Sequence, residues 1–166
     1  MLGITLLYVG AVLFVNAMML LGKVDGKSAA PMNFFTGGIT LVMNIYIIIK
    51  ASPSDPLSYY TAATGLLFSF TYLYVGINNA LELSAKGLGW YCLFVAITAI
   101  PTAVITFHNG DFRFGAIWLM WSFLWFLYFL VLSLEKQLDK FTAYVTLVEA
   151  IITCWIPGYL LLIGRW

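Results

Sequence analysis

The chain has 166 residues, of which 63% are hydrophobic and only 9% are charged, and its mean hydropathy is +0.97. Water-soluble domains are about a quarter charged, so this composition excludes a soluble domain and indicates an integral membrane protein. The net charge of +1 excludes the basic surface that binds nucleic acid, and two cysteines with one histidine exclude a disulfide scaffold and a His/Cys metal site. We expect no metal and no cofactor.

Six stretches are long and apolar enough to cross a bilayer, which takes about 20 helical residues. In chain order they are 2–22, 32–50, 59–81, 88–107, 114–134 and 141–163. The segments between them are short, so we expect successive helices to pack as antiparallel neighbours in one domain, 1–166. The block Leu7–Gly10 recurs as Leu73–Gly76, a weak repeat that three helical hairpins of common ancestry would explain. The sequence predicts an all-α integral membrane protein.

The short loops predict the orientation of the chain in the membrane. Five lysines fall on one side, and three basic residues fall on the other: Lys23, Lys27, Lys86, Lys136 and Lys140 against Lys50, Arg113 and Arg165. Cytoplasmic loops carry an excess of Lys and Arg. The bias places the first, third and fifth loops in the cytoplasm and both termini outside.

Two spans carry side chains of one kind on a single helical face. In the first span, Leu6, Val9 and Leu13 repeat every 3.5 residues on average, and in the third span Phe70 and Tyr74 form an aromatic ladder. Such a face can line a pore or pack against another helix. Periodicity alone leaves both interpretations open.

The fifth span carries a row of three tryptophans, Trp118, Trp121 and Trp125. At 100° per residue, their spacings of three and four place them within an arc of about 60°. Membrane tryptophans usually gather at the two interfaces, whereas this row reaches the middle of the span. It is either an aromatic face packed against helices or lipid, or a pore lined by flat rings between which a planar solute can slide.

Polar side chains inside the spans are the next candidates. Glu149 is the one acidic residue deep within a predicted span. Such burial costs about 3 kcal/mol on insertion scales, so Glu149 should face protein or water and have a hydrogen-bonding partner. It either ties two helices together or lies beside a solute pathway. For Asn16, Asn44 and Asn78, a hydrogen bond between helices is the better interpretation.

A lumen lined by these groups would be narrow, uncharged and mostly apolar. No ring of carbonyls or carboxylates is present to replace the hydration shell of an ion, so a small neutral solute fits better. Serine, histidine and acidic residues do not occur together at depth. We therefore predict a path for a neutral solute and no enzyme.

Blocks of residues along the chain are distinctive when taken together. They are Met1–Gly10, Lys23–Ser28, Ala63–Phe68 with Phe70–Tyr74, Trp90–Ile97, and Glu149 with Trp155–Pro157. Together they resemble the AmiS/UreI family over essentially the whole chain. The resemblance implies six helices built as hairpins, a homo-hexameric ring in the lipid of the bacterial inner membrane, and passive conduction of urea through a pore in each protomer, which would feed a cytoplasmic urease.

The resemblance also implies roles for single residues. It implies two constrictions, lined by Leu6, Val9, Leu13, Phe70, Tyr74, Trp121 and Trp125. Trp118 and Asn16 would support the pore, and Glu149 would correspond to a buried family glutamate beside the conduction path. The leading hypothesis is a urea channel. A channel for short aliphatic amides, which share the planar N–C=O unit, and a non-conducting membrane scaffold are the alternatives.

The outer loops depart from those of the acid-gated members of this family. Those members have long loops rich in histidine and carboxylates, whose protonation opens the channel. Here the corresponding loops are Ala51–Ser58 and His108–Arg113, which hold one histidine between them. We therefore predict a channel without proton gating, in which Asp55, Asp111 and His108 form at most a residual switch.

Overall fold

The computed structural model describes residues 1–166 and consists of helices joined by short turns. The helices are α1 (Leu2–Leu20), α2 (Gly26–Lys50), α3 (Pro56–Leu81), α4 (Lys86–His108), α5 (Phe112–Leu132), α6 (Asp139–Glu149), the π-helical turn η1 (Ala150–Trp155) and α7 (Ile156–Leu162). The last three are continuous, so six helices are long and apolar enough to cross a membrane. The chain is a multi-pass membrane protein, as its composition predicts.

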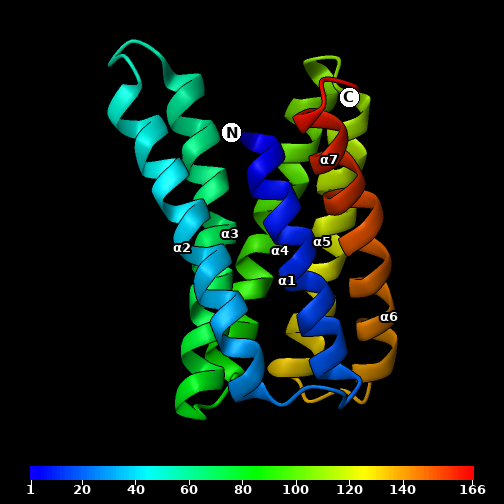
Figure 1. The fold of residues 1–166 in the computed structure, drawn as a ribbon. Coiled ribbons are helices and arrows are strands. Elements are labelled where there is room, and N and C mark those ends of the chain that lie inside the picture. Colours follow the sequence, from blue (N-terminus) through cyan, green and yellow to red (C-terminus); the bar gives the residue numbers. More distant parts are fainter.

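Both termini lie at one end of the bundle (Figure 1). We call this end, with the turns at 51–55 and 109–111, the terminal end. The opposite end holds the turns at 21–25, 82–85 and 133–138, and we call it the basic end because it carries the five lysines of the first, third and fifth loops. The two ends therefore divide the loops as the sequence predicts.

Most helix boundaries agree with the predicted ones within three residues, but α2 begins at Gly26, six residues before the predicted start. Asp25 caps this helix: its side chain accepts hydrogen bonds from the backbone N–H and the hydroxyl of Ser28, at 2.9 and 2.6 Å. Pro31 lies inside α2. A proline this close to a well-capped start removes one backbone donor and does not end the helix.

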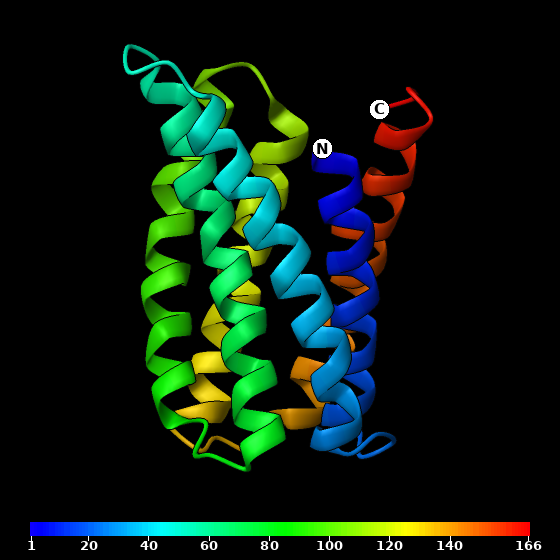
Figure 2. The ribbon, with the colours of Figure 1, turned by 60° about the vertical axis from the view of Figure 1, so that its left-hand side comes forward.

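Helix packing is uneven around the bundle. The extensive contacts lie between α2 and α3, between α4 and α5, and between α1 and the sixth span, whereas α3 and α4 touch little although they are consecutive. The α2–α3 pair also spreads away from α1 toward the terminal end (Figures 1 and 2). Successive helices are therefore not uniformly close neighbours, and the loosely packed centre leaves room for cavities.

The sixth span contains a feature that the sequence did not predict, the π-helical turn η1. Pro157 lies two residues after the end of this turn and has no N–H to continue a regular α-helical pattern. Gly10 of α1 packs against the turn: a Cβ built on Gly10 would lie 3.0 Å from both the Ala150 carbonyl oxygen and the Trp155 nitrogen. These are backbone atoms, so only glycine allows α1 to approach this closely.

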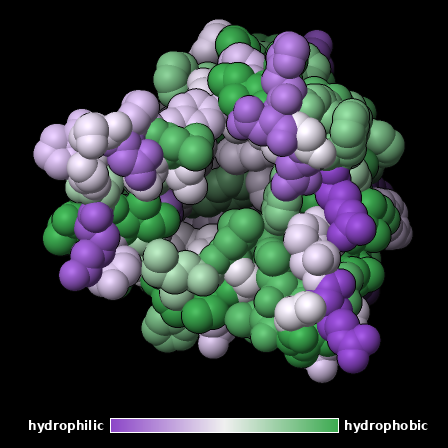
Figure 3. Space-filling model, turned by 90° about the horizontal axis from the view of Figure 1, so that it is seen from above, coloured by the Kyte–Doolittle hydropathy of each residue, from purple (hydrophilic) through white to green (hydrophobic).

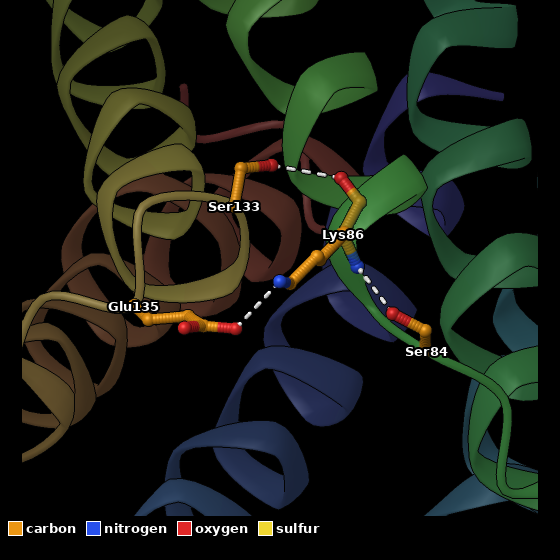
Figure 4. A network of polar contacts seen from close by, with 4 residues as sticks. All are labelled: Ser84, Lys86, Ser133 and Glu135. Carbon is orange, nitrogen blue, oxygen red and sulfur yellow. Dashed lines mark hydrogen bonds and ion pairs between the residues drawn. The ribbon is translucent and has the colours of Figure 1, made fainter.

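The basic end is held together by polar contacts between neighbouring turns. The Ser133 hydroxyl donates to the carbonyl of Lys86 at 2.7 Å, and Lys86 Nζ lies 2.9 Å from Glu135 Oε1 (Figure 4). A second ion pair joins Lys27 and Glu82 at 3.0 Å. All four charged side chains are exposed, and exposed pairs contribute little to stability. The Ser133 hydrogen bond, which is also exposed, joins the end of α5 to the start of α4.

Candidate functional site

Two cavities lie inside the bundle. The upper cavity, of about 400 Å³, extends from the terminal end, where a hollow is visible in the middle of the molecule (Figure 3). Its lining includes Leu6, Val9, Asn44, Tyr60, Thr64, Phe68, Thr102, Asp111, Trp118 and Trp121. The lower cavity, of about 110 Å³, extends toward the basic end. Its lining includes Leu13, Asn16, Phe68, Tyr72, Asn78, Trp121, Trp125 and Tyr128.

Aromatic rings stand between the two cavities. Phe68 and Trp121 line both of them. The centroid of the Phe68 ring lies 4.7 Å from that of Trp121, 4.8 Å from that of Trp125 and 5.8 Å from that of Trp118. The contacts with Trp118 and Trp121 are edge-to-face, a favoured geometry for aromatic pairs. We call these four rings the aromatic junction.

The tryptophan stripe of α5 faces the inside of the bundle. Trp121 and Trp125 are 4% and 6% exposed, and Trp118 lines the upper cavity beside them. Trp121 is the one member of the stripe whose indole N–H is hydrogen-bonded within the chain, donating to Thr153 Oγ1 at 2.9 Å. The stripe therefore lines the path between the cavities, and Trp121 is tied to the sixth span behind it.

On α3 the structure differs from the prediction. Phe70 is 48% exposed on the outer face, and Tyr74 is part-buried near Tyr91 and lines neither cavity. Their places are taken by Phe68 and Tyr72, which are buried and face the cavities. The two pairs have the same four-residue spacing but lie about 160° apart around the helix, so aromatic periodicity could not choose between them.

A second signal on α3 would have identified the inward face. Thr64 lies one turn before Phe68, and Thr71 lies beside Tyr72; both are buried and line the cavities. Small polar side chains of membrane helices are enriched at contacts with other helices. The face of α3 that carries both aromatic and hydroxyl side chains is therefore the inner one.

The predicted residues of α1 lie on the cavity side. Leu6 and Val9 line the upper cavity and Leu13 lines the lower one. Asn16 lines the lower cavity and is paired with Asn33 of α2 through two reciprocal amide hydrogen bonds of 3.0 and 2.8 Å. The interhelical bond expected for Asn16 is present, and it holds α2 to α1 at the wall of the lower cavity.

Glu149 lies away from both cavities. Its side chain is 2% exposed and borders a separate groove between α5 and α6, with Phe123 and Tyr144 among its neighbours. Its Oε2 atom is buried without a hydrogen-bonding partner, contrary to the expected pairing. The contribution of Glu149 to the interior comes from its backbone instead, because its carbonyl accepts the hydroxyl of Thr153 at 2.6 Å. The sequence placed this residue at the right depth but could not assign its direction.

The two carboxylates in the turns of the terminal end serve as helix caps. Asp55 accepts hydrogen bonds from the Ser58 hydroxyl and backbone N–H at 2.6 and 3.2 Å, and these bonds hold the pKa of Asp55 below its ordinary value. Asp111 caps α5 by accepting from the N–H of Phe114 at 3.0 Å. His108 is exposed at the end of α4. No three His, Cys, Asp or Glu side chains converge anywhere in the chain.

Comparison with known proteins identifies the family. The family profile described as AmiS/UreI family transporter matches residues 1–165. This chain belongs to the AmiS/UreI family. It is 40% identical to the acid-activated urea channel of Helicobacter pylori over an alignment of 195 positions that covers all of both chains. Since this chain has 166 residues, the H. pylori protein has insertions relative to it.

Other relatives have different names. The chain is 45% identical to the putative transporter protein AmiS2 of Rhodococcus erythropolis, in an alignment that covers 96% of this chain and 78% of that protein. It is 41% identical to a putative amidate substrates transporter protein of Mycolicibacterium smegmatis, in an alignment that covers 99% of this chain and 78% of that protein. The crystal structure of the H. pylori urea channel matches with a TM-score of 0.91 and 42% identity over 100% of this chain and 99% of that one.

Proposed function

We propose that this protein is a passive urea channel, in which urea diffuses down its gradient from the upper cavity, past the aromatic junction, into the lower cavity. The observation that carries the proposal is the arrangement of two cavities that approach from opposite ends of the bundle and meet at Phe68 and Trp121. It occurs in a chain that is 40% identical, over both full lengths, to a urea channel.

The lining explains which solutes would pass. The lower cavity has no charged side chain in its wall, and the upper cavity has only Asp111, near its mouth. An ion that entered would lose its water without receiving a replacement shell, so it is excluded. Urea is neutral and planar, and a flat solute needs the smallest displacement of the rings to pass between Phe68 and the tryptophans.

Polar groups in the lower half offer urea weak contacts. The Tyr72 hydroxyl faces the lower cavity and makes no hydrogen bond within the chain, and the indole N–H of Trp125 is likewise uncommitted. Single hydrogen bonds of this kind replace part of the lost hydration. The amide of Asn16, which also borders this cavity, is already paired with Asn33. Weak contacts of this kind let the solute leave again, as conduction requires.

The protein acts in a bacterial inner membrane as one protomer of a hexameric ring, with both termini outside. The five lysines of the basic end support this orientation, since cytoplasmic loops are rich in basic residues. The lower cavity would then open to the cytoplasm, where a urease can consume the urea that enters. Many large apolar side chains are exposed on the outside of the protomer, among them Phe35 and Phe94, as contact with lipid or other protomers requires.

Conduction in this chain does not depend on acid. The turns of the terminal end are short, and their two carboxylates, Asp55 and Asp111, are engaged as helix caps. The insertions of the acid-activated relative have no counterpart here. His108 is exposed and has no ion-pair partner in the chain.

A second candidate function is conduction of short aliphatic amides. It is favoured by the 45% and 41% identity to relatives named as AmiS2 and as an amidate substrates transporter. Acetamide shares the planar N–C=O unit of urea, and an uncharged aromatic junction discriminates only modestly between the two.

Stopped-flow swelling of proteoliposomes tests these functions together. Vesicles with the protein and empty vesicles receive equal inward gradients of urea, acetamide and glycerol at pH 7.5 and pH 5. Rapid urea influx at both pH values supports the proposal. Acetamide influx far above that of urea assigns an amide channel, and influx no faster than in empty vesicles contradicts both and supports a non-conducting scaffold.

A further inference from the structure

The wall of the aromatic junction is anchored from outside the path. The indole N–H of Trp121 donates to Thr153 Oγ1 at 2.9 Å, across from α5 to the π-helical turn of the sixth span. We propose that Thr153 is a specificity-determining positioning residue: its hydroxyl fixes the orientation of the Trp121 indole and thereby sets which planar solutes pass the junction. The inference rests on the proposed channel function and deepens it.

The Thr153 hydroxyl can act only as an acceptor toward Trp121. It donates its single proton to the carbonyl of Glu149 at 2.6 Å, and the threonine is fully buried. A hydroxyl whose proton is committed still has lone pairs for incoming donors. The direction of these lone pairs is therefore fixed by the backbone of the sixth span, and they are aimed at the indole N–H.

The π-helical turn places Thr153 in this position. Thr153 and Cys154 are consecutive residues of η1, and both are 0% exposed. Turns of this kind are often found at functional sites. Gly10 packs α1 directly against the same turn, which holds it from the other side. The acceptor for Trp121 is thus built into a rigid part of the wall.

The orientation of Trp121 determines the shape of the junction on both sides. Its ring lies at 77° to Phe68 and at 83° to Trp118, with centroids 4.7 and 5.1 Å away. It also lines both cavities. Any rotation of the indole therefore alters two ring contacts and the gap between the cavities at once.

The bond also determines what the solute meets at this point. With its N–H turned back to Thr153, Trp121 presents ring carbons to the path and offers no hydrogen-bond donor. Trp121 then distinguishes solutes by their thickness and shape and not by hydrogen bonding. Without the Thr153 hydroxyl, the N–H would be left buried and unpaired, and the indole would rotate to seek a partner in one of the cavities.

Three substitutions test the inference. Thr153→Val keeps the branched shape and removes the acceptor, and Thr153→Ser keeps the acceptor. Thr142→Val is the matched control, because Thr142 is a fully buried threonine of the same span whose hydroxyl has no partner. The readouts are the ratio of urea to N-methylurea permeability in proteoliposomes and the indole bands that report N–H hydrogen bonding in ultraviolet resonance Raman spectra. A difference spectrum against Trp121→Phe isolates the bands of Trp121.

We expect Thr153→Val to weaken the hydrogen-bond signature of Trp121 and to lower the urea to N-methylurea ratio by about threefold, as the loss of one buried hydrogen bond implies. Thr153→Ser and Thr142→Val should retain both properties of the wild type. If Thr153→Val weakens the N–H hydrogen-bond signature of Trp121 but leaves the ratio of urea to N-methylurea permeability unchanged, the inference is overturned while the channel function stands. Unchanged Raman bands overturn the positioning bond itself. A wild type that conducts no urea overturns the proposed function, whatever the spectra show.

Discussion

The two cavities on either side of the aromatic junction differ in size and chemistry. The upper one has about 400 Å³ and is bordered by hydroxyl and amide groups of Asn44, Thr64 and Thr102, whereas the lower one has about 110 Å³ and a largely apolar wall. A solute can stay hydrated in the first but must shed most of its water to enter the second. We therefore expect solutes to be selected at the junction and below it, so substitutions there should change permeability more than substitutions at the outer mouth.

The largest effect is expected from Phe68→Ala, which removes a ring that both cavities share. Joining the cavities should raise glycerol permeability about tenfold, which corresponds to a barrier lower by about 1.4 kcal/mol. Stopped-flow swelling with urea and glycerol measures the change. Phe70→Ala is the matched control, because Phe70 is on the exposed outer face two residues away. Equal effects of the two substitutions would show that Phe68 does not separate the cavities.

A second experiment tests whether the close contact of Gly10 with η1 holds α1, which lines both cavities, in place. Gly10→Ala would place a Cβ 3.0 Å from the backbone of Ala150 and of Trp155, which cannot move aside easily. We expect a loss of about 1–3 kcal/mol in stability, as for overpacked interiors, measured by thermal unfolding in detergent. Gly38→Ala meets no atom within 4 Å and should be neutral or stabilising by up to about 1 kcal/mol. A Gly10→Ala protein as stable as Gly38→Ala would contradict the close contact.

Tyr72→Phe tests the chemistry of the lower cavity by removing a hydroxyl that faces it. The loss of one weak contact with a partly dehydrated solute should lower urea flux by about two- to fivefold, within the range of a single net hydrogen bond. Initial influx rates at equal protein density give the comparison. Tyr74→Phe removes the same atom from a tyrosine that lines neither cavity and should conduct as the wild type does. If Tyr72→Phe does too, the lower wall does not contribute polar contacts.

The smallest effect is expected from pH, which acts on the helix cap that Asp55 makes at the terminal end. The pKa of Asp55 is lowered, chiefly by the Ser58 hydroxyl. A lowered pKa means that the charged cap stabilises the fold above the ordinary range of an aspartate, about 4, and that this stabilisation is lost only as the pH falls through the still lower folded value. Between pH 7.5 and pH 5 the cap stays ionised.

Urea flux should therefore differ by less than about 1.5-fold between these two pH values, because no contact of the mouth is lost in this range. Asp55→Asn, which can still cap α3 but does not titrate, should show the same small difference. A urea flux at pH 5 many times that at pH 7.5 would show that acid gates the channel. If Asp55→Asn removed this difference in flux, Asp55 would be the residue that senses pH.

Hydropathy and helical periodicity were sufficient for the parts of the molecule that depend on local sequence. They predict the six spans, because a run of about 20 apolar residues has few alternatives to crossing a bilayer. They also group Leu6, Val9 and Leu13 on one face of α1 and the three tryptophans on one face of α5, and the structure places both faces on the cavity side. On α5 the regular three- and four-residue spacing leaves only one face for the tryptophans.

Only the tertiary structure decided which ladder of α3 faces inward, where the side chain of Glu149 points, and that Thr153 meets Trp121 across a π-helical turn. Phe68 and Tyr72 and their counterparts Phe70 and Tyr74 are equally aromatic and equally spaced. In a bilayer the lipid is as apolar as the protein interior, so hydrophobicity does not distinguish the inner face of a helix from the outer one. That choice depends on how neighbouring helices pack, and it is made by contacts between residues far apart in the sequence.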